Sequence, residues 1–284
     1  MRADQAALPA LPGCILNRWV PRRCPGHGPW TSTVLGYEGD CHLMSKKRVP
    51  AAKKSGPAPV PLLLIDGLQV GYGLPVCPPV TVNVEPGTVV AVVGANGSGK
   101  STLLRTVVGL LPPLKGRLEL LGKAIDDRSR VFRADLAVEL GDDAFFPTLT
   151  VREHLRLVCF GHGVQDAGAV TEALLEDFGL SERSEALPAA LSSGQRRRLL
   201  LAAVFARPRR LLILDEPEQR LDSSMRDDLT QRLVEEREAG GAVLMATHDP
   251  QLVRGAATSV VVISDHDVRV LDADAGADVI LREL

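Results

Sequence analysis

A glycine-rich segment carries the clearest chemical pattern in this sequence. Residues 94–101 read GANGSGKS and match GxxxxGK[ST], in which glycines let backbone N–H groups turn toward a phosphate. Lys100 is predicted to reach the β- and γ-phosphates of a nucleotide, and the Ser101 hydroxyl to bind Mg²⁺. The predicted nucleotide-binding residues of this segment are Gly94, Asn96, Gly97, Ser98, Gly99, Lys100, Ser101 and Thr102.

Two adjacent carboxylates follow a separate apolar run. Leu211–Leu214 leads directly into Asp215 and Glu216. Ligands of open α/β sheets bind at the carboxyl ends of the strands, so Asp215 is predicted to hold Mg²⁺. Glu216 is predicted to polarise an attacking water. Taken alone, a strand that ends in Asp-Glu is equally typical of an ordinary acidic turn.

The elements that must position these groups are strands alternating with helices. The runs 89–93, 211–214 and 242–246 are apolar on both faces, as in strands buried in a parallel sheet, and 80–84 alternates. The stretch 100–111 repeats apolar residues at helical spacing, as do 151–160 and 170–178. This order predicts an α/β domain with a mostly parallel sheet. Its longest apolar run has eight residues, too short to cross a bilayer.

The first 57 residues differ from the remainder in composition. They hold nine Lys or Arg against three Asp or Glu, and nine of the 20 prolines lie within residues 1–61. We therefore expect a flexible basic leader over 1–57 and a folded domain over 58–284. Met44 offers an alternative start, and under that hypothesis residues 1–43 are not native. Three leader cysteines have spacings that fit no usual zinc pattern.

A third motif lies between the glycine-rich segment and the carboxylate pair. Residues 191–195 read LSSGQ, beginning 91 residues after Lys100, and Asp215 follows Gln195 by 20 residues. Alone, LSSGQ is typical of a capped helix start. Together with GANGSGKST and LILDEP, however, it resembles the nucleotide-binding domain of ABC transporters over about residues 61–271. The resemblance implies a P-loop NTPase of ABC type, with a mostly parallel central sheet, an antiparallel β subdomain and a helical subdomain at about 142–190.

The same resemblance implies ATP as substrate, Mg²⁺ as its metal, and further site residues. Tyr72 matches the aromatic that stacks on adenine, Asp222 the D-loop aspartate, and His248 the switch histidine that contacts the γ-phosphate. Two such domains pack head to tail, as a homodimer or heterodimer. Each ATP then lies between one P-loop and the partner's signature segment, formed by Ser192, Ser193, Gly194 and Gln195.

One position departs from the family pattern. Counted back from 147–150, the Q-loop glutamine that reaches the metal and water should stand at Gly141. Glu139, Asp142 or Asp143 is a possible substitute as an oxygen ligand of Mg²⁺. The alternative is that hydrolysis is slow and nucleotide binding dominates.

By resemblance, the leading function is the ATPase subunit of an ABC transporter. It would act on a transmembrane permease formed by another chain, at the cytoplasmic face of the membrane, and the 13 residues after 271 favour an export type. With a net charge of −2, no nucleic-acid partner is expected. One alternative is a soluble ABC-type ATPase of translation, DNA maintenance or iron–sulfur assembly, although the single P-loop and the 91-residue spacing disfavour the first two. Another is a weakly hydrolysing nucleotide-binding sensor.

Overall fold

A mostly parallel sheet of six strands forms the centre of the domain. The computed structural model describes residues 61–125, 134–141 and 144–283. The strands lie in the order β10-β9-β3-β8-β7-β6, and only β10 runs antiparallel to its neighbour. Their bounds are β3 Val89–Gly94, β6 Leu136–Glu139, β7 Leu211–Asp215, β8 Ala242–Ala246, β9 Ser259–Ile263 and β10 Val268–Leu271. The strands predicted at 89–93, 211–214 and 242–246 are confirmed.

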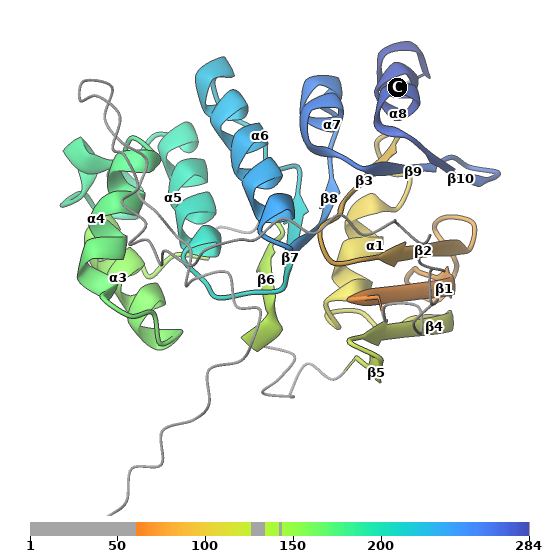
Figure 1. The fold of residues 1–284 in the computed structure, drawn as a ribbon, viewed down its shortest axis with the longest axis horizontal. Helices are drawn as coiled ribbons and strands as arrows, with labels where there is room; N and C mark the ends of the chain where they lie inside the picture. The colour runs from red at the N-terminus through yellow and green to blue at the C-terminus, as the bar shows by residue number, and fades with distance from the viewer. Residues whose placement is uncertain (1–60, 126–133, 142–143, 284) are drawn as a thin grey trace, which may run out of the picture. The chain divides into compact units, whose positions relative to one another are not determined.

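A second, antiparallel sheet lies beside α1 in Figure 1. Its order is β2-β1-β4-β5, and Leu63 of β1 faces Val84 of β2 on one side and Leu120 of β4 on the other. The alternation predicted for 80–84 is confirmed, because β2 alternates buried and exposed residues. The strands are β1 Leu63–Gln69, β2 Val80–Val84, β4 Lys115–Leu120 and β5 Lys123–Ala124.

Helices cover both faces of the six-stranded sheet. In Figure 1, α6, α7 and α8 lie on one side of it, and α1 lies on the other side with the antiparallel sheet. The helices are α1 Lys100–Val107, α3 Val151–Gly161, α4 Ala167–Asp177, α5 Ser193–Phe205, α6 Ser223–Glu238, α7 Pro250–Ala256 and α8 Ala273–Glu283, with short 3₁₀ turns η2 Ser181–Arg183 and η3 Pro188–Ala190. The predicted α/β architecture is therefore confirmed.

Strand β3 contributes to two hydrophobic cores because its side chains alternate between the two faces of the sheet. Val89 and Val93 pack in the core that includes Leu229 of α6. Val90 and Val92 pack in the core that includes Leu104 of α1 and the antiparallel sheet. Burial on both faces explains why this strand is apolar throughout, and it fixes the end of β3 where the glycine-rich segment begins.

The helix predicted over 100–111 is shorter than expected. It ends at Val107, and Gly109 takes a φ of 81°, a left-handed conformation that commonly terminates helices. The N–H groups of Leu110 and Leu111 both donate to the Arg105 carbonyl, which closes the helix end. Leu111 therefore lies beyond the helix rather than on its buried face.

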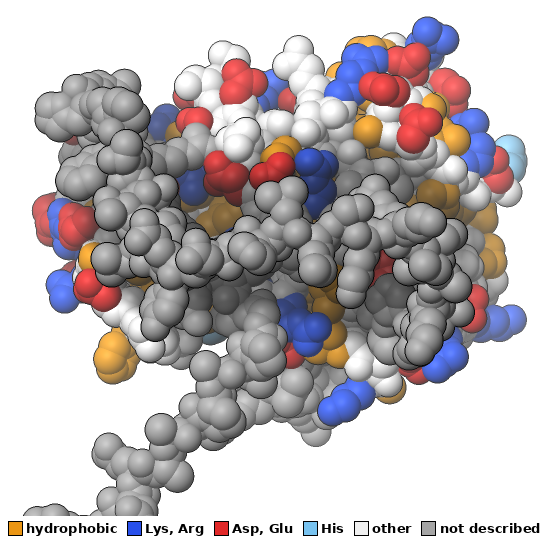
Figure 2. Space-filling view, in the orientation of Figure 1, with side chains coloured by type: hydrophobic (Ala, Val, Ile, Leu, Met, Phe, Trp, Pro, Cys, Tyr) orange, Lys and Arg blue, Asp and Glu red, His pale blue; other side chains and the backbone are white. Residues whose placement is uncertain are grey.

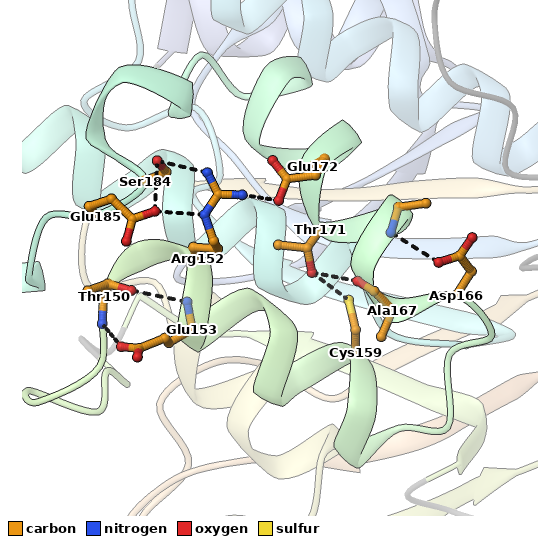
Figure 3. A network of polar contacts seen from close by, with 11 residues as sticks. Thr150, Arg152, Glu153, Cys159, Asp166, Ala167, Thr171, Glu172, Ser184 and Glu185 are labelled. Carbon is orange, nitrogen blue, oxygen red and sulfur yellow. Dashed lines mark hydrogen bonds and ion pairs between the residues drawn. The ribbon is translucent and has the colours of Figure 1, made fainter.

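The helical region between β6 and β7 is held by a polar network. Arg152 of α3 donates to Glu185 at 2.8 Å and to Ser184 at 3.1 Å, and it pairs with Glu172 of α4. Figure 3 shows the guanidinium pointing toward all three side chains. The predicted helices 151–160 and 170–178 correspond to α3 and α4. The proposed subdomain limits of about 142–190 remain a prediction, as does the leader over 1–57, and the leader lies outside the described residues.

Ion pairs also join the last elements of the chain. Arg254 of α7 pairs with Asp278 of α8, and Arg269 of β10 lies 3.2 Å from Glu283 of α8. Figure 2 shows acidic and basic side chains interspersed over this C-terminal part. Within the described ranges, no helix combines the length and hydrophobicity that crossing a membrane requires.

Candidate functional site

The glycine-rich segment forms a tight loop between β3 and α1. Gly97 and Gly99 have φ values of 84° and 97°, which other residues rarely adopt. A Cβ on Gly94 would lie 2.4 Å from the carbonyl oxygen of Ile263, and one on Gly99 would lie 2.9 Å from Cγ2 of Val76. Glycine is therefore required at Gly94 by the close approach of another backbone segment, and at Gly99 by its left-handed conformation.

Helix α1 starts without a side-chain cap, and no acidic residue lies in its first turn. Each of the other six described α-helices is capped by a side-chain oxygen, contributed by Thr150, Asp166, Ser192, Asp222, Asp249 and Asp272. The first N–H groups of an α-helix have no partner within the helix and carry a partial positive charge. The start of α1 is thus left available for an anion, as a phosphate-binding loop requires.

Lys100 lies within this loop and is only 5% exposed. Its Nζ donates to the carbonyl oxygens of Gly94 at 2.8 Å and Ala95 at 3.0 Å. Burial lowers the pKa of Lys100, while the nearby charges of Glu216 and Asp215 raise it. The structure therefore holds the ammonium group between the loop backbone and the two carboxylates at the end of β7.

Asp215 and Ser101 face each other across the site. Burial raises the pKa of Asp215, and the hydrogen bond from Ser101 lowers it. Asp215 Oδ1 is buried, and no hydrogen-bond partner for it occurs among the described residues. Those residues also contain no cluster of three or more His, Cys, Asp or Glu side chains suited to a metal. Ser101 and Asp215 can thus supply two oxygens to Mg²⁺, which usually takes its other ligands from phosphate and water.

Glu216 and His248 meet at the adjacent ends of β7 and β8. His248 Nε2 lies 3.5 Å from Glu216 Oε1, and Gln219 Nε2 donates to Glu216 Oε2. Burial lowers the pKa of His248, the Lys100 charge lowers it further, and the Glu216 charge raises it. Glu216 has a φ of 47°, a left-handed conformation that costs energy in a residue other than glycine. The structure therefore brings the two predicted catalytic residues together on a strained turn.

Arg197, which sequence reasoning missed, links the signature helix to this turn. It is 6% exposed and donates to the carbonyl oxygens of Asp215 at 3.0 Å and Glu216 at 2.7 Å. It also pairs with Glu139, whose Oε1 accepts a hydrogen bond from the Gly141 N–H at 2.7 Å. Both Glu139 oxygens are thus engaged by the protein. The spacing after LSSGQ gave no signal for this role, since arginines occupy three successive positions there.

At the position expected for the Q-loop glutamine, Gly141 has a φ of 80°, and a Cβ built on it would meet open space. A side chain is therefore disfavoured there by the backbone conformation rather than by crowding. Asp142 and Asp143, the other two acidic candidates, lie outside the described residues.

The signature segment forms the start of α5. Ser192 Oγ accepts a hydrogen bond from the Gln195 N–H at 3.2 Å, and Gln195 Oε1 accepts one from the Ser192 N–H at 2.9 Å. A Cβ on Gly194 would lie 2.9 Å from the Arg220 carbonyl oxygen. The segment therefore forms a capping box, which is the capped helix start that LSSGQ alone is typical of. Within the described part of the chain, no hydrogen bond or ion pair joins it to Lys100.

Asp222 and Tyr72 are two further predicted site residues, and among the described contacts no hydrogen bond or ion pair joins either of them to the carboxylate pair. Asp222 accepts a hydrogen bond from the Met225 N–H at the start of α6, and its Oδ2 lies 3.8 Å from Arg198. Tyr72 is 70% exposed in the loop between β1 and β2. The same loop carries Val76, whose side chain approaches Gly99. Tyr72 is thus free to contact a ligand that extends beyond the P-loop.

The described geometry agrees with comparisons to known proteins. A family model described as ABC transporter matches residues 77–219. The chain is 30% identical over 211 residues to the ABC-type transporter ATP-binding protein EcsA of Bacillus subtilis, with 73% of this chain and 85% of that protein covered. It is 39% identical over 170 residues to the cytochrome c biogenesis ATP-binding export protein CcmA of Bordetella bronchiseptica, covering 60% and 76%.

Another relative carries a name that refers to import. It is the putative 2-aminoethylphosphonate import ATP-binding protein PhnT of Salmonella choleraesuis, 34% identical over 216 residues, with 73% and 56% covered. Among solved structures, the ATP-binding subunit of an ABC transporter superposes with a TM-score of 0.69 at 29% identity, covering 75% of this chain and 91% of that one. The solved structure thus shares the fold described above.

Proposed function

Because this chain belongs to the ABC transporter family of ATP-binding proteins, we propose that it binds and hydrolyses ATP to drive a transmembrane permease formed by another chain. The observation that carries the proposal is the meeting of Glu216 with His248 at 3.5 Å, beside a buried P-loop lysine. A nucleotide-binding site alone would not need this carboxylate–imidazole pair. The proposal covers transport in either direction, since relatives are named for export and for import.

The chemistry begins with binding of the phosphates. The N–H groups at the uncapped start of α1 bind phosphate oxygens, and Lys100 adds a positive charge beside the β- and γ-phosphates. Ser101 and Asp215 would hold Mg²⁺, which would supply positive charge to neutralise the phosphates. The uncapped start of α1 and the unsatisfied Asp215 oxygen support these assignments.

Hydrolysis is then an attack by water on the γ-phosphorus. Glu216 accepts the proton of that water, the oxygen–phosphorus bond to ADP breaks, and phosphate and ADP are released. His248 contacts the γ-phosphate and helps to hold the attacking water. Its imidazole is well placed for this because its neutral form, favoured by burial, has one nitrogen that donates and one that accepts.

A second copy of the domain, or a related one, completes the site in this proposal. Ser192, Ser193, Gly194 and Gln195 form a helix start whose capping box engages the Ser192 and Gln195 N–H groups, and within the described chain they make no bond to the P-loop. Head-to-tail packing would bring this segment to the γ-phosphate held by the partner, with Asp222 beside it. Tyr72, exposed on its loop, would stack on the adenine.

The permease is proposed to dock on the helical region that contains α3 and α4, at the cytoplasmic face of the membrane. Leu157 and Phe160 of α3 are exposed, with Phe160 80% accessible. A transmembrane partner is consistent with relatives named for export and import. The proposed permease interaction would be tested by co-purification of the chain with the multi-span protein encoded by a neighbouring gene.

The central experiment compares the wild-type protein with Glu216→Gln. The amide keeps the size of the side chain but cannot take up the proton, so turnover should fall by ~10²–10⁴ while ATP binding is retained. Stalled hydrolysis should accumulate an ATP-bound dimer, detected by size-exclusion chromatography with light scattering. Glu182→Gln, an exposed change in η2, is the matched control and should leave turnover and mass unchanged.

The outcomes separate the alternatives. A wild-type protein without measurable ATP binding overturns the proposal. If ATP binds, wild-type turnover is negligible and Glu216→Gln changes nothing, the weakly hydrolysing sensor is favoured instead. A Glu216→Gln protein that loses turnover yet remains monomeric with saturating ATP contradicts the head-to-tail dimer but not the catalytic assignment.

A further inference from the structure

A third carboxylate lies two residues beyond Glu216 and belongs to none of the motifs described above. Glu218 follows Pro217 in the turn after β7 and is 8% exposed. Burying a carboxylate is costly unless hydrogen bonds satisfy it. A carboxylate in the interior of this turn therefore needs hydrogen-bond partners, and these lie in the segment that directly follows β8.

Both partners of Glu218 belong to the segment that carries His248. Glu218 Oε1 accepts hydrogen bonds from Thr247 Oγ1 at 2.7 Å and from the His248 N–H at 3.0 Å. Thr247 is fully buried, and its Oγ1 also accepts a hydrogen bond from the Asp249 N–H at 3.0 Å. Residues 247–249 are thus attached, directly or through one hydroxyl, to a single carboxylate oxygen.

These bonds hold the backbone segment that carries the His248 ring. The His248 backbone N–H is held by Glu218, and its Nε2 lies 3.5 Å from Glu216 Oε1. The side chain itself is 32% exposed, so packing alone constrains it weakly. A second backbone bond, from the Glu216 N–H to the Ala246 carbonyl at 2.9 Å, joins the same two segments. The turn with Glu216 and the segment with His248 are therefore locked together on both sides of the pair.

We propose that Glu218 is a positioning residue that fixes the His248 imidazole against Glu216 for ATP hydrolysis. The inference rests on the proposed function, in which Glu216 and His248 act on the water and the γ-phosphate. Glu218 touches neither nucleotide nor water in this scheme and acts through His248. Its loss should therefore lower kcat and leave the KM for ATP nearly unchanged.

Two substitutions distinguish the loss of the Glu218 hydrogen-bond acceptor from the loss of its negative charge. Glu218→Leu removes the acceptor, whereas Glu218→Gln keeps a carbonyl oxygen for Thr247 and His248. Displacing a catalytic group by about 1 Å costs on the order of 10²-fold in rate, so Glu218→Leu should lower kcat by about that factor. Glu218→Gln should retain most of the wild-type kcat. Thr247→Val removes one of the two hydrogen bonds, so its kcat should lie between those of Glu218→Gln and Glu218→Leu. It replaces Glu218→Leu as the test if that variant does not fold.

A double-mutant cycle with His248→Ala distinguishes positioning from general damage. If Glu218 acts through His248, Glu218→Leu in the His248→Ala background should change kcat by less than about 2-fold, since independent effects alone would multiply. Equal losses in both backgrounds overturn the inference, because a structural role does not depend on the histidine. It is also overturned if His248→Ala slows turnover while Glu218→Leu does not.

A measurement that does not depend on ATP hydrolysis tests this inference separately from the proposed function. In protein with labelled histidines, the His248 ring signal is assigned by its loss in His248→Ala. We expect one ordered signal in wild type and in Glu218→Gln, and a signal shifted toward that of a free imidazole in Glu218→Leu. An unchanged signal in Glu218→Leu overturns the positioning role. An altered signal supports it even if the wild-type protein hydrolyses no ATP, in which case the proposed function alone fails.

Discussion

Arg197 and Glu139 form a buried ion pair, with 2.7 Å between Arg197 Nη1 and Glu139 Oε2 and both side chains at most 6% exposed. The pair connects the helix that starts with the signature segment to the end of β6, next to Gly141. Burial raises the pKa of Glu139, and the Arg197 charge lowers it. Because Arg197 also binds the Asp215 and Glu216 carbonyls, three separate segments depend on one guanidinium.

Removing either member of this pair should destabilise the domain. Arg197→Met leaves the Glu139 carboxylate buried without its cation, which typically costs about 3–5 kcal/mol of unfolding free energy. Glu139→Gln should also destabilise, and the double variant should lose less than the two single losses added together. Chemical denaturation measures all three. Arg117→Met breaks an exposed pair with Glu119 and should change stability by about 0.5 kcal/mol or less. If the stability losses of the two single variants add up to that of the double variant, the two residues do not act as a pair.

Lys100→Ala should weaken ATP binding without unfolding the domain. The variant removes the cation beside the proposed phosphate site, and a charged hydrogen bond contributes ~1.5–3 kcal/mol. Isothermal titration calorimetry measures the loss directly. Lys123→Ala, an exposed change in β5, is the matched control and should bind ATP as the wild type does. Equal affinities for Lys100→Ala and the wild type would contradict the assignment of residues 94–101 as a phosphate-binding loop.

Gly94→Ala should destabilise the junction between β3 and the loop. The new methyl would lie 2.4 Å from the Ile263 carbonyl oxygen and 2.6 Å from Ser98 Oγ, so backbone must move, at a cost of about 1–3 kcal/mol. Gly161→Ala places the same methyl in open space at the end of α3. That control should be neutral or stabilising by up to about 1 kcal/mol. Thermal unfolding of the two variants compares them, and equal melting temperatures would refute the steric argument.

His154 should make stability depend on pH below neutrality. It is 3% exposed between the rings of Phe145 and Phe146, and burial lowers its pKa from the ordinary value of 6.5. Below about pH 6.5 the unfolded chain takes up a proton that the folded protein resists. The unfolding free energy contributed by His154 is therefore complete above that pH and is lost progressively as the pH falls through the lower, folded pKa.

The measurement is the unfolding free energy between pH 7.5 and pH 5, for wild type and for His154→Leu. The leucine variant should lose less stability on acidification, by about 1.4 kcal/mol for each unit of the lowered pKa. His266→Leu, in the exposed turn before β10, is the control and should follow the wild-type curve. Parallel curves for wild type and His154→Leu would exclude His154 as the source of the acid sensitivity.

Local patterns were sufficient to locate the motifs and most of the elements that carry them. Val89–Val93 is apolar at every position because β3 is buried on both faces. Gly97 and Gly99 mark backbone conformations that only glycine adopts easily. Such signals depend on neighbours within a few residues. The apolar pattern continues to Leu111, but the helix does not, because Gly109 in a left-handed conformation ends α1. The predicted end of this helix was therefore wrong.

The contacts that organise the site were decided only by the tertiary structure. Glu216 meets His248, Glu218 binds Thr247, and Arg197 pairs with Glu139 across gaps of 32, 29 and 58 residues. These meetings follow from the order β6-β7-β8 in the sheet, which places the carboxyl ends of three parallel strands side by side. Side-chain periodicity records which face of a strand is buried, but it does not record which strands are neighbours. For that reason Arg197 and Glu218 left no local signal, although each holds a part of the site in place.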